Sequence, residues 1–221
     1  MAASGGSDAK AFEAAFISEV FHSLSQPLTA LHCTLDLALQ RDQTLEQLRA
    51  SVQTALDSAE RLRQRLLLVR ALNDAAMPGA ALEPTDLGQV LRELHEDMSP
   101  LFEAGGRRFE LDLRCSHLLT VRADKLRLTR ALFVFVEYLF RYLPQDAQLS
   151  IGLDKSDSGQ AEIRVASASS LPVSPAEAGS GENRSCELEL LRRTVVASGG
   201  DFVLLEHTSA RSVWLASLPL V

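Results

Sequence analysis

The stretch from Phe21 to Leu28, FHSLSQPL, holds the residues of this chain that are best suited to chemistry. A neutral imidazole is a competent nucleophile near physiological pH, so His22 could accept a phosphoryl group. Gln26 follows one helical turn later, where its amide could hydrogen-bond a phosphoryl oxygen or position a water for dephosphorylation. Pro27 removes a backbone hydrogen bond and can bend a helix beside this site.

Two long amphipathic helices are predicted to position these residues. Apolar residues recur at steps of three and four over about 9–40 and again over about 45–77, which is the pattern of helices packed side by side. The first seam comprises Ile17, Phe21, Leu24, Leu28, Leu31, Leu35 and Ala38, and the second comprises Leu45, Leu48, Val52, Ala55, Ala59, Leu62, Leu66 and Val69. The polar residues 41–44 predict a turn, and therefore an antiparallel hairpin.

A lone hairpin cannot bury its whole apolar surface. Further leucines off the strict seam widen the stripe at Leu39, Leu56, Leu67, Leu68 and Leu72. Two hairpins paired as a dimeric four-helix bundle would cover this stripe, so the sequence predicts a homodimer.

The rest of the chain alternates predicted helices and mostly antiparallel strands, which indicates a two-layer α/β sandwich. Helices are expected at about 87–103, 124–142 and 185–198, and strands at about 108–114, 119–122, 147–153, 160–167, 201–206 and 212–218. The expected organisation is a disordered terminus (1–8), a hairpin (9–77), a linker (78–84) and the sandwich (85–221). The predicted fold class is therefore α+β.

The amino-acid composition limits the classes of protein to which this chain could belong. Hydrophobic residues make up 46% of the chain, which is enough for a packed core. The net charge of -7 argues against nucleic acid as a partner. The three cysteines show no metal-ligand spacing, and no signal peptide or long apolar span is visible. We therefore expect a cytoplasmic protein with no membrane partner.

From about residue 16 to 219 the chain resembles the catalytic core of sensor histidine kinases. The phosphoacceptor box of that family reads His-Glu-Leu-Arg-Thr-Pro-Leu or His-Glu-Leu-Asn-Gln-Pro-Leu, and residues 22–28 are similar to it. Residues 82–87 resemble the entry to the family's ATP domain, 121–124 a strand–helix junction within it, and 195–200 the turn before its last hairpin. The resemblance implies a dimerising helical hairpin followed by a Bergerat-type ATP-binding sandwich.

The departures from the family concern the nucleotide site and the phosphoacceptor. Val134 and Tyr138 stand where the family has asparagines that hold Mg-ATP, and a valine offers no oxygen to a cation. No Asp-x-Gly-x-Gly motif occurs in residues 166–172. The glycine positions of the phosphate loop align with Asn183, Ser185 and Glu187, of which Glu187 would repel a triphosphate. Ser23 replaces the usual acid after the histidine.

These departures make the chain similar to dimeric histidine phosphotransferases, which are built on a kinase core and exchange phosphate with receiver domains of bacterial phosphorelays. The resemblance implies a phosphoacceptor at His22, with Ser23 and Gln26 as further catalytic candidates. It implies a phosphotransferase and not an active ATP-dependent kinase, with no cofactor or metal of its own. The receiver would supply Mg²⁺.

A docking surface for the receiver is expected on the hairpin. If the turn centres near residue 42, Arg61, Arg63 and Arg65 lie at the height of the histidine, where guanidinium groups suit phosphate and the acidic receiver pocket. Pro27 would complete this partner-binding set. Two alternatives stay open: a pseudokinase scaffold that binds signalling proteins without carrying phosphate, and an active kinase with an unconventional nucleotide site.

Overall fold

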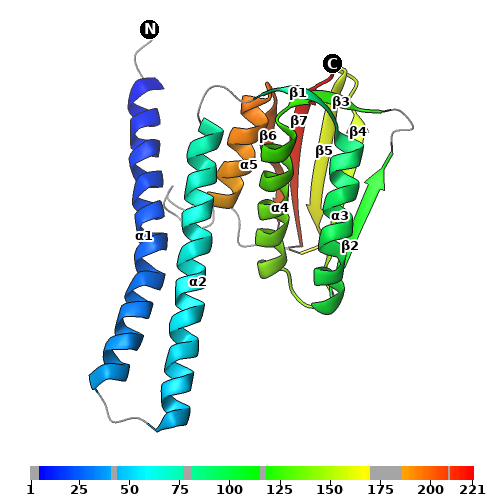
Figure 1. Cartoon of the computed structure of the whole chain (residues 1–221). Coiled ribbons are helices and arrows are strands. Elements are labelled where there is room, and N and C mark those ends of the chain that lie inside the picture. Colours follow the sequence, from blue (N-terminus) through cyan, green and yellow to red (C-terminus); the bar gives the residue numbers. More distant parts are fainter. Residues whose placement is uncertain (1–4, 41–43, 77–80, 115–117, 170–185, 209) are drawn as a thin grey trace. The chain divides into compact units, whose positions relative to one another are not determined.

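The computed structural model describes residues 5–40, 44–76, 81–114, 118–169, 186–208 and 210–221 (Figure 1). Contacts divide the chain into two compact units. The first contains the two long helices as far as Ala71, and the second comprises Leu72–Ser174 and Glu187–Val221. The expected hairpin ran to residue 77, whereas the division by contacts falls after Ala71.

The first unit consists of the two predicted helices, α1 (Gly5–Gln40) and α2 (Leu45–Ala76). α1 begins at Gly5, within the terminus that was expected to be disordered, while residues 1–4 and the turn residues 41–43 lie outside the described ranges. Thr44 and Gln47 cap α2 reciprocally: each side chain bonds the backbone N–H of the other, at 3.3 and 3.0 Å. No helix in the described ranges is long and apolar enough to cross a membrane.

Large apolar side chains along both helices remain uncovered. Phe21 is 66% exposed, Leu28 53% and Leu35 43% on α1, and Leu66 is 53% exposed on α2. All four belong to the predicted seams. An apolar stripe of this kind on a chain marks an interaction surface, because exposing it to water is unfavourable.

The second unit is the expected mixture of helices and strands. Its elements are β1 (Glu83–Asp86), α3 (Leu87–Ala104), β2 (Arg108–Leu113), β3 (Thr120–Ala123), α4 (Lys125–Tyr142), β4 (Gln148–Lys155), β5 (Gln160–Ser167), α5 (Cys186–Ala197), β6 (Asp201–Thr208) and β7 (Arg211–Pro219). Five strands form one sheet in the order β2-β4-β5-β7-β6, in which β2 and β4 are parallel and the other pairs antiparallel. Helices α3, α4 and α5 lie along one face of it (Figure 1).

Strand β1 differs from the prediction. Its first two residues, Glu83 and Pro84, were assigned to the linker, but β1 pairs antiparallel with β3 in a separate two-stranded ribbon. Both strands of such a ribbon are edges, so a proline without an N–H is tolerated there. Residues 77–80 of the predicted linker lie outside the described ranges.

The core forms where the strands turn alternate residues toward the helices. On β4, Leu149, Ile151 and Leu153 are buried, whereas the residues between them face the other side. Trp214 on β7 meets the ring of Phe135 on α4 edge-on, with ring centroids 5.5 Å apart. Aspartates cap the first turns of α3 and α4: Asp86 accepts a hydrogen bond from Gly88 N at 2.9 Å, and Asp124 accepts one from Arg127 N at 3.0 Å.

A buried carboxylate stabilises α5. Glu189 has a side chain only 1% exposed and accepts two hydrogen bonds from Arg192, at 2.7 and 2.8 Å, and one from Arg193 at 2.7 Å. Burial raises the pKa of this carboxyl, but the hydrogen bonds from the two arginines outweigh that effect and hold the pKa below its ordinary value. The carboxylate is therefore charged in the folded chain and pairs with two cations.

We expect Glu189→Gln to lower the free energy of unfolding by about 2 kcal/mol at neutral pH, because both guanidinium groups lose their anionic partner. The folded-state pKa of Glu189 is depressed, so its stabilisation is present above the unfolded pKa of 4.5 and is lost as pH falls through the folded pKa. Urea unfolding at decreasing pH should show the gap between wild type and variant closing. Exposed Glu96, changed to Gln, is the control and should cost less than about 0.5 kcal/mol. A gap independent of pH would contradict the assignment.

Candidate functional site

His22 lies near the middle of α1 with its side chain exposed to solvent. Its neighbour Phe21 belongs to the apolar seam, so the imidazole projects beside that seam rather than into it. The helix continues through Pro27 without a break. The ring therefore lies exposed on a long regular helix. A partner that donates a phosphoryl group to the ring would need such access.

The amide of Gln26 contacts the imidazole directly. Its Nε2 lies 2.9 Å from Nε2 of His22, one turn earlier on the same helix. An amide nitrogen can only donate a hydrogen bond, so the ring nitrogen must accept through its lone pair. In a neutral ring this arrangement places the proton on Nδ1 and leaves the lone pair on Nε2. The spacing predicted a shared helix face; this contact adds which nitrogen is unprotonated.

Ser23 and Pro27 modify the helix beside the ring. The Ser23 hydroxyl donates to the carbonyl oxygen of Val20 at 2.9 Å, and so is directed along the backbone rather than to the imidazole. Pro27 has no N–H, so the carbonyl oxygen of Ser23, four residues earlier, lacks its usual helical partner. The catalytic role of Ser23 stays a prediction.

The three arginines predicted for docking lie on α2. Arg61 donates to the hydroxyl of Ser58 at 3.2 Å, and Arg63 binds Glu60 through two hydrogen bonds of 2.7 and 2.8 Å. The hydrogen bond from Arg63 lowers the pKa of the Glu60 carboxyl. These hydrogen bonds of Arg61 and Arg63 go to their own helix and not to His22, while Arg65 is half-buried.

Val134 and Tyr138, predicted to replace the asparagines of a nucleotide site, lie on α4. Val134 is half-buried, and Tyr138 is 7% exposed with its ring centroid 5.0 Å from that of Tyr142. Neither side chain provides the carboxamide oxygen that a nucleotide-bound cation needs. Glu187 is buried, whereas Asn183 and Ser185 of the predicted phosphate loop lie outside the described residues. No group of three potential metal ligands occurs among the residues that the structure describes.

Comparison with known proteins establishes the fold. No protein-family model matches the chain, and no curated protein matches it in sequence. The histidine kinase AdeS of Acinetobacter baumannii has a TM-score of 0.69 at 15% identity, over 90% of this chain and 98% of that chain. The histidine kinase ThkA, in complex with the response regulator protein TrrA, has a TM-score of 0.71 at 15% identity, over 93% and 61%.

A third solved structure, ShkA in complex with AMPPNP, has a TM-score of 0.63 at 19% identity and covers 92% of this chain and 46% of that chain. AdeS and ThkA are both histidine kinases. The predicted α+β fold with a histidine-kinase-like core is thus confirmed. At these identities the likeness establishes the fold alone.

The Gln26 contact predicts the tautomer of His22. In ¹⁵N-resolved spectra of the full chain, the neutral His22 ring should be protonated at Nδ1, and Gln26→Leu should shift it toward protonation at Nε2, because the leucine cannot donate to Nε2. His32 is exposed on the same helix and makes no hydrogen bond to any residue in the described ranges, so it serves as an internal reference that should not change. A wild-type ring protonated at Nε2 would show that the amide does not donate to it.

Proposed function

We propose that this chain is a histidine phosphotransferase of a bacterial two-component phosphorelay, which carries phosphate on His22 between receiver aspartates without binding ATP. The observation that carries the proposal is the exposed imidazole whose Nε2 accepts the Gln26 hydrogen bond, on a histidine-kinase-like core. The missing oxygen ligands at Val134 and Tyr138 separate this function from that of an ATP-dependent kinase.

The transfer would proceed in line. The Nε2 lone pair attacks the phosphorus of a receiver phospho-aspartate, and the bond from phosphorus to the carboxylate oxygen breaks with its electron pair leaving on the aspartate. The reverse step passes the phosphoryl group to another receiver. The ring keeps its Nδ1 proton during attack and can release it to solvent afterwards. The receiver supplies the Mg²⁺ that neutralises the phosphoryl oxygens.

Gln26 has two successive roles in this scheme. Before transfer its amide holds the ring so that Nε2 carries the lone pair. Once phosphorus occupies Nε2, the same N–H groups are released and can donate to a phosphoryl oxygen one turn along the helix. Ser23 could join them only by exchanging its bond to the Val20 carbonyl.

A receiver domain is the proposed partner. The neighbour ThkA was solved with a response regulator protein bound, which supports a kinase-like core as a platform for such a partner. We place the contact on the hairpin around Pro27, with Arg61, Arg63 and Arg65 facing the acidic receiver pocket. Arg63 would then exchange Glu60 for a receiver carboxylate.

We further propose that two chains pair through the hairpin. The exposed seam residues Phe21, Leu28, Leu35 and Leu66 support this pairing, since each chain leaves them uncovered. A bundle of four helices buries such stripes on all sides. Pairing would also stiffen α1 on both sides of His22.

Phosphotransfer from a phosphorylated receiver tests the function. With ³²P-labelled receiver and Mg²⁺, wild type should become labelled, and His22→Ala should lose at least about a hundredfold of the labelling rate because the nucleophile is gone. His32→Ala is the matched control and should be labelled as wild type. ATP in place of the receiver should give no label. Unlabelled wild type that still binds receivers would favour a scaffold instead.

Pairing is tested by sedimentation. Leu35→Glu should raise the dimer dissociation constant at least about a hundredfold, because a carboxylate would be buried at each copy of the interface. His32→Glu places the same charge on an exposed position off the seam of α1 and should leave sedimentation unchanged. A wild-type monomer at all concentrations, or a dimer unaffected by Leu35→Glu, would reject the hairpin interface.

A further inference from the structure

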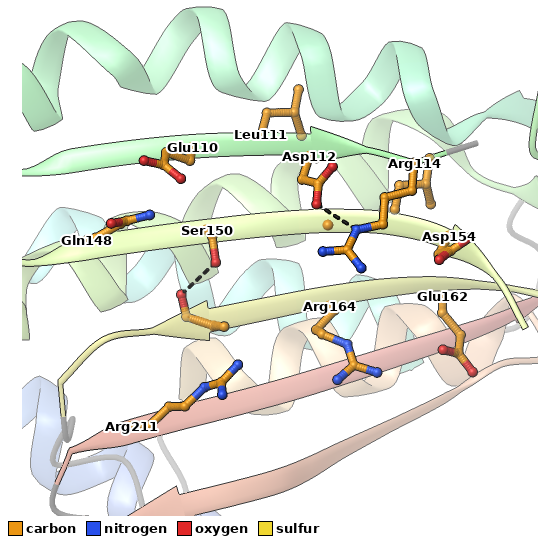
Figure 2. A pocket seen from close by; sticks show the side chains of 13 residues that line it. Glu110, Leu111, Asp112, Arg114, Gln148, Ser150, Asp154, Glu162, Arg164 and Arg211 are labelled. Atoms are coloured by element: carbon orange, nitrogen blue, oxygen red, sulfur yellow. Dashed lines mark hydrogen bonds and ion pairs between the residues drawn. The ribbon is translucent and has the colours of Figure 1, made fainter. Parts of the chain in front are cut away.

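The face of the five-stranded sheet opposite the helices contains a groove of about 760 Å³ (Figure 2). Its walls and floor come from β2, β4, β5 and β7, all within the second unit. Strand alternation explains why this face is polar: the apolar residues of each strand point to the helices, and the residues between them point here. The groove is therefore on the opposite side of the sheet from the α4 positions (Figure 1).

The floor of the groove is made of small residues. Ser150 and Gly152 on β4 lie beside Ala166 on β5, so the floor is largely backbone. A glycine inside a strand costs conformational entropy and provides no packing, and it often marks a close approach of another group. A Cβ added at Gly152 would meet only the carbonyl oxygens of Asp112 and Arg164, at 3.8 and 3.9 Å. The packing of the fold itself thus does not require glycine at this position.

Opposite charges stand on the two sides of Gly152. The register pairs Gly152 with Asp112 on β2 and with Arg164 on β5, so the two charged residues are two strand spacings apart, about 9.6 Å between their Cα atoms. Arg164 makes no hydrogen bond or ion pair with any residue that the structure describes. Asp112 binds Arg114 at 2.7 Å through one carboxylate oxygen, and Glu110 lies next to it on the same face.

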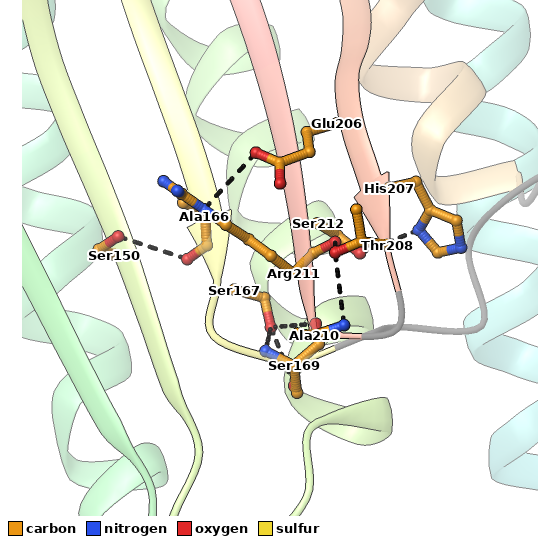
Figure 3. Close-up of polar contacts among 10 residues, drawn as sticks. All are labelled: Ser150, Ala166, Ser167, Ser169, Glu206, His207, Thr208, Ala210, Arg211 and Ser212. Atoms are coloured by element: carbon orange, nitrogen blue, oxygen red, sulfur yellow. Dashed lines mark hydrogen bonds and ion pairs between the residues drawn. The ribbon is translucent and has the colours of Figure 1, made fainter.

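Arg211, at one end of the groove, extends its side chain toward Ala166 on the floor (Figure 2 and Figure 3). Its guanidinium lies 3.9 Å from Glu206 on β6 (Figure 3). The hydroxyl of Ser150 is directed to the carbonyl oxygen of Ala166, at 3.4 Å. Arg164 is thus a cation over the floor, with Glu162 two residues away on the same strand, and Asp112 with Glu110 lies on the other side, on β2.

The size of the groove argues for a small occupant. Four strands span about 14 Å and residues 148–154 about 20 Å, which gives a floor of roughly 300 Å². A stable protein interface buries about 800 Å² per partner, so this floor is too small for one. Its volume is within the range of small-molecule sites, about 300–1,000 Å³.

We propose that the groove binds a small zwitterion of amino-acid or short-peptide size. Its carboxylate would bind Arg164 in bidentate geometry, its ammonium group would face Asp112 and Glu110, and its body would lie on Gly152. The acidic residues on the rim disfavour a polyanion such as a nucleotide. This site does not depend on His22, so its test is independent of the phosphotransfer proposal.

The test is a titration of the ¹⁵N-labelled full chain with diglycine. The amide signals of Gly152 and Arg164 should shift saturably, with a dissociation constant of about 1 mM because the groove is open and polar. N-acetylglycine, which lacks the ammonium group, and glycine ethyl ester, which lacks the carboxylate, should each bind at least tenfold more weakly. The absence of a saturable shift, or equal binding of N-acetylglycine, would overturn the proposal.

Two variants locate the site. Gly152→Val fills the floor, and Arg164→Gln removes the cation; each should weaken diglycine binding at least tenfold. Arg108→Gln removes an arginine from the same face outside the groove lining and should leave binding unchanged. Thermal unfolding checks that each variant is folded. If Gly152→Val does not fold, the binding measured for Arg164→Gln alone decides the outcome. Undiminished binding by Arg164→Gln would overturn the proposal.

Discussion

If His22 carries phosphate, as we propose, the hydrogen bond from Gln26 to its ring reconciles two requirements that conflict in such a histidine. The ring must be exposed to its partner, and it must also hold one orientation. Packing cannot provide that order, because burial would hide the nucleophile. A directional contact from the same helix can, and at 2.9 Å it also selects the nitrogen that carries the lone pair. This contact exists only while α1 is regular through Pro27, so the chemistry depends on the order of the whole helix.

The order of α1 in turn depends on what covers its apolar stripe. An isolated helix pair with side chains such as Phe21 and Leu28 more than half exposed gains little from the hydrophobic effect. Propensity alone rarely holds long helices in water, so tertiary or quaternary burial must contribute most of their stability. In the proposed dimer the surface that pairs the chains is also the surface that stiffens the support of His22. Phosphotransfer and association would then share one structural cause.

The sequence predicted which helices and strands form better than it predicted individual strand pairings and side-chain contacts. The reason is that helix signals are local, whereas pairings and contacts depend on the folded chain. Heptad spacing and capping aspartates such as Asp86 and Asp124 act locally, so the helices could be located from the chain alone. Strand β1 was missed because Glu83 and Pro84 have no strand propensity, and only pairing with β3 makes them extended. The burial of Glu189 was missed because a glutamate is usually exposed unless arginines pair with it. The His22 contact depends on rotamers, which spacing does not encode.

The second unit shows that the residues that make a fold and the residues that would hold a nucleotide are separate sets. Folding requires the apolar residues that the strands and helices turn inward, such as Phe135 and Trp214. Nucleotide binding requires a few polar groups at helix and loop positions outside that set. Val134 and Tyr138, which the resemblance aligns with the family's asparagines, add apolar contact area instead, and the buried Tyr138 is itself part of the core. The same independence holds for the opposite sheet face, where Gly152 and Arg164 contribute nothing to the core. The polar residues of such a sandwich can therefore change while its architecture is kept.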